Sequence, residues 1–190
     1  AINELGACKN NNLNDLASAV SKGALKGARG NSGVILSQIL KGLCTTLKGA
    51  TEIDVKIFIK ALKSATDTAY KAVSKPKEGT ILTVSRAISE FAVKYKKKDF
   101  EEFFPEFIQA GQEALDQTPE LLPVLKKAGV VDAGGMGLLV VYQGMYKALK
   151  GEKIEGAIAE TKPAVVKQED EVSLEHADIF NLGRIEFGYC

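Results

Sequence analysis

The residues best suited to chemistry form a glycine-rich stretch, Gly-Ala-Arg-Gly-Asn-Ser-Gly, at residues 27–33, directly before an apolar helical run. Asn31 and Ser32 are residue types that cap helix N-termini, because their side-chain oxygens accept the unpaired N–H groups of the first turn. Gly30 and Gly33 have no Cβ, so the backbone can bend sharply and approach a ligand. A helix N-terminus of this kind, beside an arginine, can hold a phosphate. The alternative is an ordinary glycine-rich turn between two helices.

Two later stretches share this pattern. Glu-Gly-Thr at residues 78–80 precedes one apolar run, and Asp-Ala-Gly-Gly at residues 132–135 precedes another. Each places a small or hydroxyl-bearing residue, together with glycine, where a helix is expected to begin. One such junction is common in helical proteins. Three in one chain predict several helix N-termini that converge on one anionic ligand.

The composition narrows the function classes. The chain has 190 residues, with 24 acidic and 25 basic side chains, so its overall charge gives no reason to expect nucleic acid or a membrane surface as partner. A lysine run at residues 94–98 is better explained as a solvated helix end than as a nucleic-acid contact. The three cysteines show no paired spacing, and the sequence shows neither a secretory signal nor a membrane span. We expect a cytoplasmic protein.

The hydrophobic spacing predicts an all-α fold. Apolar residues recur every three to five positions in successive segments, as on one face of a helix. The expected helices cover approximately residues 13–25, 32–47, 53–73, 80–93, 99–115, 118–125 and 134–149. We expect one helical domain at residues 1–155, a linker at 156–178, and the start of a following domain, with strand-like alternation, at 179–190.

Several residues mark where these helices begin. Asn12 or Asn14 can cap the first helix of the series, and Asp99 can cap the helix that follows the lysine run. Thr118, followed by proline, is a strong start signal for a short helix. Pro105 lies inside an expected helix, where it is tolerated only near the start or as a kink.

The three glycine-bearing stretches resemble the kinase domain of bacterial fatty acid kinase, which is similar to the nucleotide-binding (L) subunit of dihydroxyacetone kinase. The matching segments are residues 27–38, 78–84 and 129–138, and the resemblance covers roughly residues 12–150. It implies an up-and-down helical barrel that binds ATP and magnesium at one end. It also implies transfer of the ATP γ-phosphoryl group to a fatty-acid carboxylate, which a separate DegV-like fatty-acid-binding protein presents.

The resemblance implies positions for the nucleotide. The glycine-rich stretch would line the phosphates, Thr80 would lie beside the nucleotide, and the stretch that begins at Asp132 would form another wall. With the arginine of the first stretch, the predicted nucleotide site comprises Arg29, Gly30, Asn31, Ser32, Gly33, Thr80, Asp132, Gly134 and Gly135. In the family, a middle domain and a DegV-like domain follow this one. Residues 187–190 resemble the opening of that middle domain, and the resemblance allows a homodimer of the full-length protein.

One feature of the family has no counterpart in this sequence. The family's magnesium ligands are aspartates in an Asp-Gly-Asp-Thr-Gly-Thr-Asn segment, which we expect upstream of Ala1. Magnesium is usually held by carboxylates together with substrate phosphates, and phosphoryl transfer relies on the metal to neutralise charge on the phosphate oxygens. For this chain by itself we therefore predict no metal ligands, weak nucleotide binding and no kinase activity. The pattern identifies no catalytic residue.

Other functions and roles remain open at this point. The domain could serve phosphoryl transfer to another small acceptor, as in dihydroxyacetone kinase, or bind nucleotide for regulation without chemistry. It could also be a purely structural helical domain. Arg29 could pair with a phosphate or with a helix C-terminus, and Asp132 could cap a helix, orient a ligand or do both. Glu78 is the acidic residue near Thr80, but nothing in the pattern assigns it to a metal.

Overall fold

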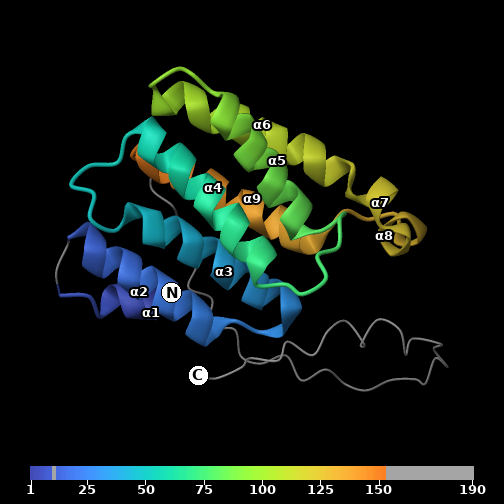
Figure 1. Cartoon of the computed structure of the whole chain (residues 1–190), viewed down its shortest axis with the longest axis horizontal. Helices are drawn as coiled ribbons and strands as arrows, with labels where there is room; N and C mark the ends of the chain where they lie inside the picture. The colour runs from blue at the N-terminus through green and yellow to red at the C-terminus, as the bar shows by residue number, and fades with distance from the viewer. Residues whose placement is uncertain (10–11, 153–190) are drawn as a thin grey trace.

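The computed structural model describes residues 1–9 and 12–152, and this part of the chain consists of helices joined by turns (Figure 1). The helices are α1 (Ile2–Gly6), α2 (Leu13–Gly27), α3 (Gly30–Leu47), α4 (Val55–Lys71), α5 (Ile81–Lys94), α6 (Phe100–Asp116), α7 (Thr118–Leu121), α8 (Pro123–Ala128) and α9 (Ala133–Leu149). The described residues include no strand, so the all-α prediction is confirmed for them. The expected linker and the expected following strand lie outside the described residues.

The long helices form an up-and-down bundle. Each helix from α2 to α6 packs against the next in the chain and runs in the opposite direction, and α9 returns to pack on α5 and α6 (Figure 1). As a result, α2, α4 and α6 end at the same end of the bundle at which α3, α5 and α9 begin. The short helices α7 and α8 lie at this end as well.

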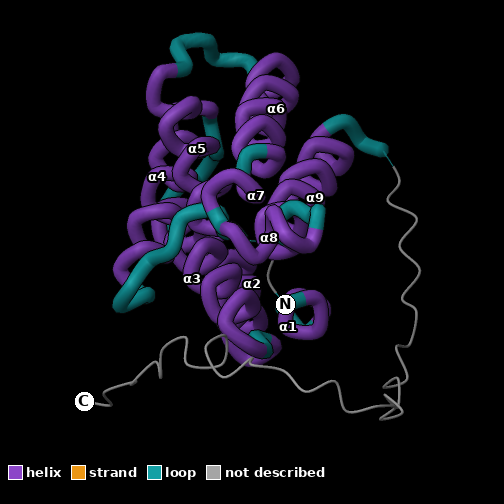
Figure 2. The backbone as a smooth tube through the Cα atoms, turned by 90° about the vertical axis from the view of Figure 1, so that its right-hand side faces the viewer, coloured by secondary structure: helices purple, strands orange, loops and turns teal. Residues whose placement is uncertain are grey.

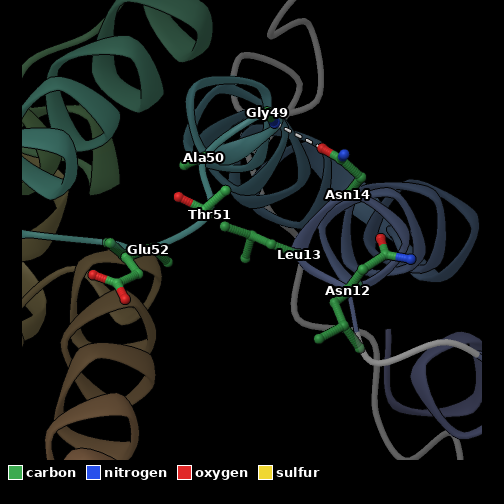
Figure 3. Close-up of a pocket in the computed structure, with 9 residues that line it drawn as sticks. Asn12, Leu13, Asn14, Gly49, Ala50, Thr51 and Glu52 are labelled. Carbon is green, nitrogen blue, oxygen red and sulfur yellow. Dashed lines mark hydrogen bonds between the residues drawn. The ribbon is translucent and has the colours of Figure 1, made fainter.

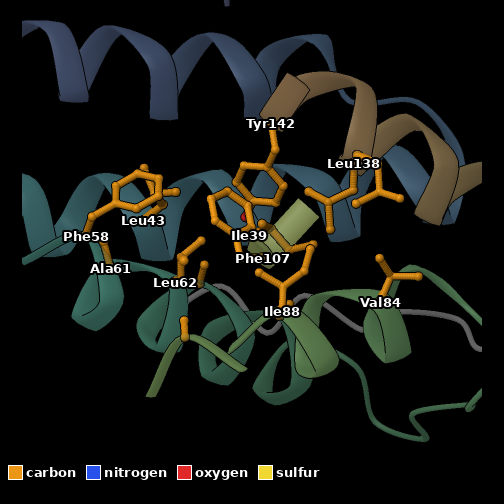
Figure 4. Packing of buried hydrophobic residues seen from close by; sticks show 14 of the residues in the cluster. Ile39, Leu43, Phe58, Ala61, Leu62, Val84, Ile88, Phe107, Leu138 and Tyr142 are labelled. Atoms are coloured by element: carbon orange, nitrogen blue, oxygen red, sulfur yellow. The ribbon is translucent and has the colours of Figure 1, made fainter. Parts of the chain in front are cut away.

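The core draws on five helices. Ile39 of α3, Leu62 of α4, Ile88 of α5, Phe107 of α6 and Tyr142 of α9 are each at most 2% exposed and point toward one another (Figure 4). Full burial of one such side chain contributes about 1.5–3 kcal/mol. This packing fixes the five helices as one unit and so fixes the relative positions of their ends.

Side-chain caps begin most of the long helices. Their residues are Asn12, Asp54, Thr80, Asp99 and Asp132, each of which accepts a backbone N–H of the first turn. Asn12 caps α2, with Oδ1 2.9 Å from the Asp15 nitrogen. Asn14 instead accepts the Gly49 N–H at 2.7 Å. Of the two expected residues, Asn12 therefore caps α2 and Asn14 does not.

The start of α3 differs from the prediction. The helix begins at Gly30, its N-cap residue is Arg29, and the Arg29 side chain makes no cap hydrogen bond. Asn31 and Ser32 lie within the first turn and are exposed. Only two residues separate α2 from α3, so the chain must reverse at once, and Gly30 makes this reversal with a φ of 62°. The early reversal places both expected cap residues inside the helix.

The segment after α6 also differs. We expected one short helix capped by Thr118, but the structure has two, α7 and α8. Pro123 separates them, because the residue before a proline is pushed out of the helical region, and Leu122 is extended at φ −130° and ψ 103°. Thr118 is fully buried, and its hydroxyl donates to the Leu115 carbonyl at 2.7 Å rather than capping α7.

Pro105 lies inside α6 without ending it. Proline has no N–H, so the carbonyl of Glu101, four residues earlier, lacks its helical donor. The hydroxyl of Tyr146 in α9 donates to this carbonyl at 3.3 Å, and the Tyr146 ring stacks on Phe104 with ring centroids 5.6 Å apart. A contact between helices thus replaces the hydrogen bond that proline removes.

We expect Tyr146→Phe to lower the free energy of unfolding by about 0.5–1.5 kcal/mol, the usual net contribution of one hydrogen bond. In a Pro105→Ala background the same change should have a smaller effect, because alanine restores the N–H that bonds to the Glu101 carbonyl. Urea denaturation of the four proteins in this double-mutant cycle measures the coupling. Equal effects of Tyr146→Phe in both backgrounds would contradict this role for the hydroxyl.

Candidate functional site

The three predicted helix starts lie at one end of the bundle. The chain enters α3, α5 and α9 at the end that carries α7 and α8 (Figure 1), and Figure 2 looks onto this end. The starts of α5 and α9 are in contact, since a Cβ on Gly134 would lie 3.3 Å from the Ile81 Cβ. The start of α3 lies at the same end, but the three atoms nearest to a Cβ on Gly33 all belong to Ala28 of its own turn. The fold therefore joins two of the starts directly and places the third on the same end.

At the start of α3, Arg29 takes the second of its two expected roles. Its Nη1 atom donates to the carbonyl of Ala28 at 2.8 Å and to that of Lys26 at 3.2 Å, both at the end of α2. A cation at a helix C-terminus satisfies carbonyls that have no partner within the helix. Arg29 thus fastens the turn between α2 and α3, directly beside the exposed Asn31 and Ser32.

At the start of α9, Asp132 is a cap. Its Oδ2 accepts the Gly135 N–H at 2.7 Å, which is the geometry of an N-cap. Its own N–H donates at 3.0 Å to the hydroxyl of Thr118, the residue that is buried against Leu115. Asp132 is therefore held from both sides. Whether its carboxylate also orients a ligand stays a prediction.

At the start of α5, the backbone turns sharply at Gly79. This residue has a φ of 81°, and a Cβ there would lie 2.8 Å from the Leu122 Cβ and 3.0 Å from the Thr118 carbonyl oxygen. Thr80 caps α5 by accepting the Leu82 N–H at 3.3 Å. Its hydroxyl donates to the Lys77 carbonyl at 2.9 Å. The loop before α5 is therefore wedged against α7, and the hydrogen bond from Thr80 to Lys77 holds the loop together.

Glu78, next to this turn, is the centre of a cluster formed by Tyr70, Glu78, Thr83 and Arg86, here called the Glu78 cluster. Its Oε2 accepts the Thr83 hydroxyl at 2.6 Å and Arg86 Nη2 at 2.8 Å. Its Oε1 accepts the Tyr70 hydroxyl at 3.0 Å. Partial burial raises the pKa of Glu78, but these hydrogen bonds, led by that of Thr83, outweigh it and hold the pKa below its ordinary value. The carboxylate is therefore ionised at neutral pH.

The arrangement can attract an anion locally. Antiparallel neighbours bring helix C-termini to the same end, so the macrodipoles of the bundle largely offset one another. The attraction must come from the backbone N–H groups of the first turns, which act over one turn only. Glycine at residues 30, 33 and 134 leaves little side chain around these groups. Such helix starts can bind phosphate oxygens.

The described residues contain no group of three or more His, Cys, Asp or Glu side chains that could hold a metal ion. The two acidic residues nearest the helix starts are engaged, Asp132 as a cap and Glu78 in its cluster. These residues fit a phosphate better than a magnesium ion, which prefers carboxylate oxygens.

A hollow in the described part of the chain lies elsewhere. It has a volume of about 620 Å³ and opens where the α3–α4 loop meets the start of α2 (Figure 3), at the opposite end of the bundle. Its charged lining residue is Glu52, which would repel a phosphate, and the Gly49 N–H already bonds to Asn14. Size alone therefore does not mark the site, and the helix starts remain the better candidate for an anion.

Several residues that support the site were not predicted from the sequence. Thr118 was assigned as a cap but links α6 to the start of α9. Thr83, Arg86 and Tyr70 carry no motif of their own, but together they fasten the loop before α5. The spacing of Thr83 and Arg86 from Glu78 offered a weak signal, because a glutamate just before a helix can reach its first two turns.

Comparisons with known proteins cover the same region. The profile of the DAK2 domain matches residues 1–147. A Staphylococcus epidermidis protein from strain RP62A, named only as an uncharacterized protein, is 44% identical over 181 residues, covering 94% of this chain and 32% of the relative. A protein of Staphylococcus aureus strain USA300 with the same kind of name is 44% identical over 183 residues, with coverage of 94% and 32%. The chain thus spans about a third of the length of these curated relatives.

Among the described residues, no helix has the length and apolar composition needed to cross a bilayer.

Proposed function

This chain belongs to the DAK2 domain family, and from that premise we propose that it is the ATP-binding domain of a fatty acid kinase. The family is kinase-related and of a nucleotide-binding type. In the proposed reaction, the γ-phosphoryl group of ATP is transferred to a fatty-acid carboxylate presented by a DegV-like binding protein. The proposal for the acceptor and the partner rests on the motifs at residues 27–38, 78–84 and 129–138.

The observation that carries the proposal is the placement of three glycine-bearing helix starts at one end of the bundle. We propose that the first turn of α3 holds the phosphates through backbone N–H groups and the side chains of Asn31 and Ser32. The starts of α5 and α9, which contact each other, would form the facing wall of the site. Thr80, Asp132 and Gly134 would then lie along the nucleotide, whereas Gly135 faces Val84 and Leu115 in the core and supports this wall from behind.

Magnesium is part of this proposal, although the described residues hold no group of three or more His, Cys, Asp or Glu side chains that could bind it. We propose that aspartates outside this chain supply them, in the longer protein of which such a domain is a part. When bound, the ion would neutralise charge on the transferred phosphoryl group. The residues of this chain would bind and orient the phosphates and keep them in a fixed position relative to the acceptor.

Two other functions compete. Phosphoryl transfer to another small acceptor would give ATP consumption that depends on that acceptor rather than on a fatty acid with its binding protein. A regulatory nucleotide-binding module would bind ATP but consume none, even in the longer protein with magnesium. Assays of the longer protein with ATP, magnesium and each acceptor in turn distinguish these cases.

We also propose that the longer protein forms a homodimer. Light scattering tests this by measuring its molar mass in solution.

The test within this chain uses Asn31→Ala and Ser32→Ala. Both residues are exposed and lie in the first turn of α3. Ser32→Ala should change the free energy of unfolding by no more than about 0.5 kcal/mol, and urea denaturation of both variants checks that each stays folded under the conditions of the titration. A hydrogen bond to a charged group contributes about 1.5–3 kcal/mol. We therefore expect the Kd for ADP, measured by calorimetric titration, to rise about tenfold or more in each variant.

The matched control is Asn12→Ala at the opposite end of the bundle. It removes a cap from α2 and should lower the free energy of unfolding by about 1 kcal/mol, with ADP affinity unchanged. If both α3 variants bind ADP as tightly as the unmodified protein, the phosphates do not lie at the start of α3.

A further inference from the structure

We propose that Glu78 is a positioning residue, whose carboxylate locks residues 78–80 onto the first two turns of α5 and so sets where this helix start meets a phosphate. This inference rests on the function proposed above. It concerns the Glu78 cluster, which lies beside the helix start rather than in it. Its members come from α4, the loop before α5, and α5 itself.

Three side chains of the described residues donate hydrogen bonds to the Glu78 carboxylate. The Thr83 hydroxyl and Arg86 Nη2 share Oε2, at 2.6 and 2.8 Å, and the Tyr70 hydroxyl takes Oε1 at 3.0 Å. Such a site needs an acceptor at both oxygens, which an ionised carboxylate provides and an amide does not. A glutamine at this position would turn an NH₂ group toward at least one donor.

The Thr83 hydroxyl connects the Glu78 carboxylate to the backbone N–H of Gly79. The Thr83 hydroxyl donates its proton to Glu78 and, through its lone pair, accepts the Gly79 N–H at 2.8 Å. Thr83 is 5% exposed, so water is a poor substitute for this hydroxyl. Glu78 therefore orients the hydroxyl, and the hydroxyl holds Gly79, the residue directly before the cap of α5.

Glu78 affects the position of the loop before α5 more than the stability of the fold. The side chains of Arg86 and Glu78 are 42% and 44% exposed, and ion pairs of this exposure contribute little to stability because water screens them. Arg86 has a second ion pair, to Glu90 at 3.2 Å, one turn further along α5. Both pairs hold the same guanidinium, but only the pair with Glu78 reaches the loop before the helix. The main effect of Glu78 is thus the placement of this loop.

The test compares Glu78→Gln with Glu90→Gln. Each variant removes one carboxylate partner of Arg86 and one negative charge. We expect Glu78→Gln to raise the Kd for ADP about five- to tenfold, the equivalent of one lost hydrogen bond, with little change in melting temperature. Glu90→Gln should bind ADP as the unmodified protein does. Equal affinities in all three proteins would overturn the inference while leaving the proposed function intact.

A second measurement does not depend on nucleotide. Amide hydrogen exchange at Gly79, measured without ligand, should accelerate about tenfold or more in Glu78→Gln and in Thr83→Val, if one hydrogen bond is lost. Thr83→Ser, which keeps the hydroxyl, should restore both slow exchange and ADP affinity. If the unmodified protein binds no nucleotide, the proposed function fails, and the role in a phosphate site fails with it. Unchanged exchange at Gly79 in both variants would overturn the locking of the loop itself.

Discussion

Gly79→Ala is expected to lower the free energy of unfolding by about 2–5 kcal/mol, from two separate causes. At a φ of 81° an L-residue carries a penalty of about 1–2 kcal/mol. The new methyl group would also lie 2.8 Å from the Leu122 Cβ and 3.0 Å from the Thr118 carbonyl oxygen, and overpacking of this kind costs about 1–3 kcal/mol. The backbone atoms involved cannot move aside without shifting α7 and the start of α5. Urea denaturation measures the loss.

Gly129→Ala is the matched control. Gly129 has a φ of 65°, but a Cβ there would meet nothing within 4 Å. This variant should carry only the backbone penalty, about 1–2 kcal/mol. A loss in Gly79→Ala no larger than that in Gly129→Ala would show that the loop before α5 is not wedged against α7.

Gly135→Val is expected to destabilise the protein by about 3 kcal/mol, because this glycine is a packing residue. It is buried, and its Cβ would lie 2.7 Å from Val84 Cγ2 and 3.1 Å from Leu115 Cδ1. Valine adds two further carbons to a space that does not admit the first. A Cβ on Gly137 in the same helix would meet nothing within 4 Å, so Gly137→Val should change the free energy of unfolding by no more than about 0.5 kcal/mol. Thermal and urea unfolding of both variants test this difference.

Gly134 is expected to behave differently from its neighbour. Its Cβ would lie 3.1 Å from Asp132 Oδ2 and 3.3 Å from the Ile81 Cβ, so alanine fits with a small shift between α9 and α5. Gly134→Ala should therefore fold normally and weaken ADP binding more than it weakens the fold. Normal ADP affinity in a folded Gly134→Ala protein would make this glycine a packing residue too.

The sequence predicted the fold well because its signals are local. Helical spacing and the cap residues Asn12, Asp99 and Asp132 act within one or two turns, and the structure bears them out. The up-and-down arrangement was implied by the family resemblance, not by the helical spacing, and the helices of the described residues pack in this way. The start of α3 was wrong because a two-residue connection forces a left-handed Gly30, which overrides the cap preference of Asn31 and Ser32.

The supporting contacts of the site could not be predicted in the same way. The bond from Asp132 to Thr118 joins residues 14 positions apart, and that from Tyr70 to Glu78 reaches back to α4. Which side chains meet at such distances depends on how the helices pack. Pro123 was visible in the sequence, and its effect on the preceding residue should have divided the short helix after α6.

The most direct test of the phosphate site is an amide NMR titration of this chain with ADP, without and with magnesium. The proposed site predicts that shift changes concentrate at residues 29–33, 79–82 and 132–135, the starts of α3, α5 and α9. The hollow near Asn14 and Thr51, at the opposite end of the bundle, should show no change. Changes that centre on that hollow, or none at the three helix starts at saturating nucleotide, would contradict the claim that these helix starts bind phosphate.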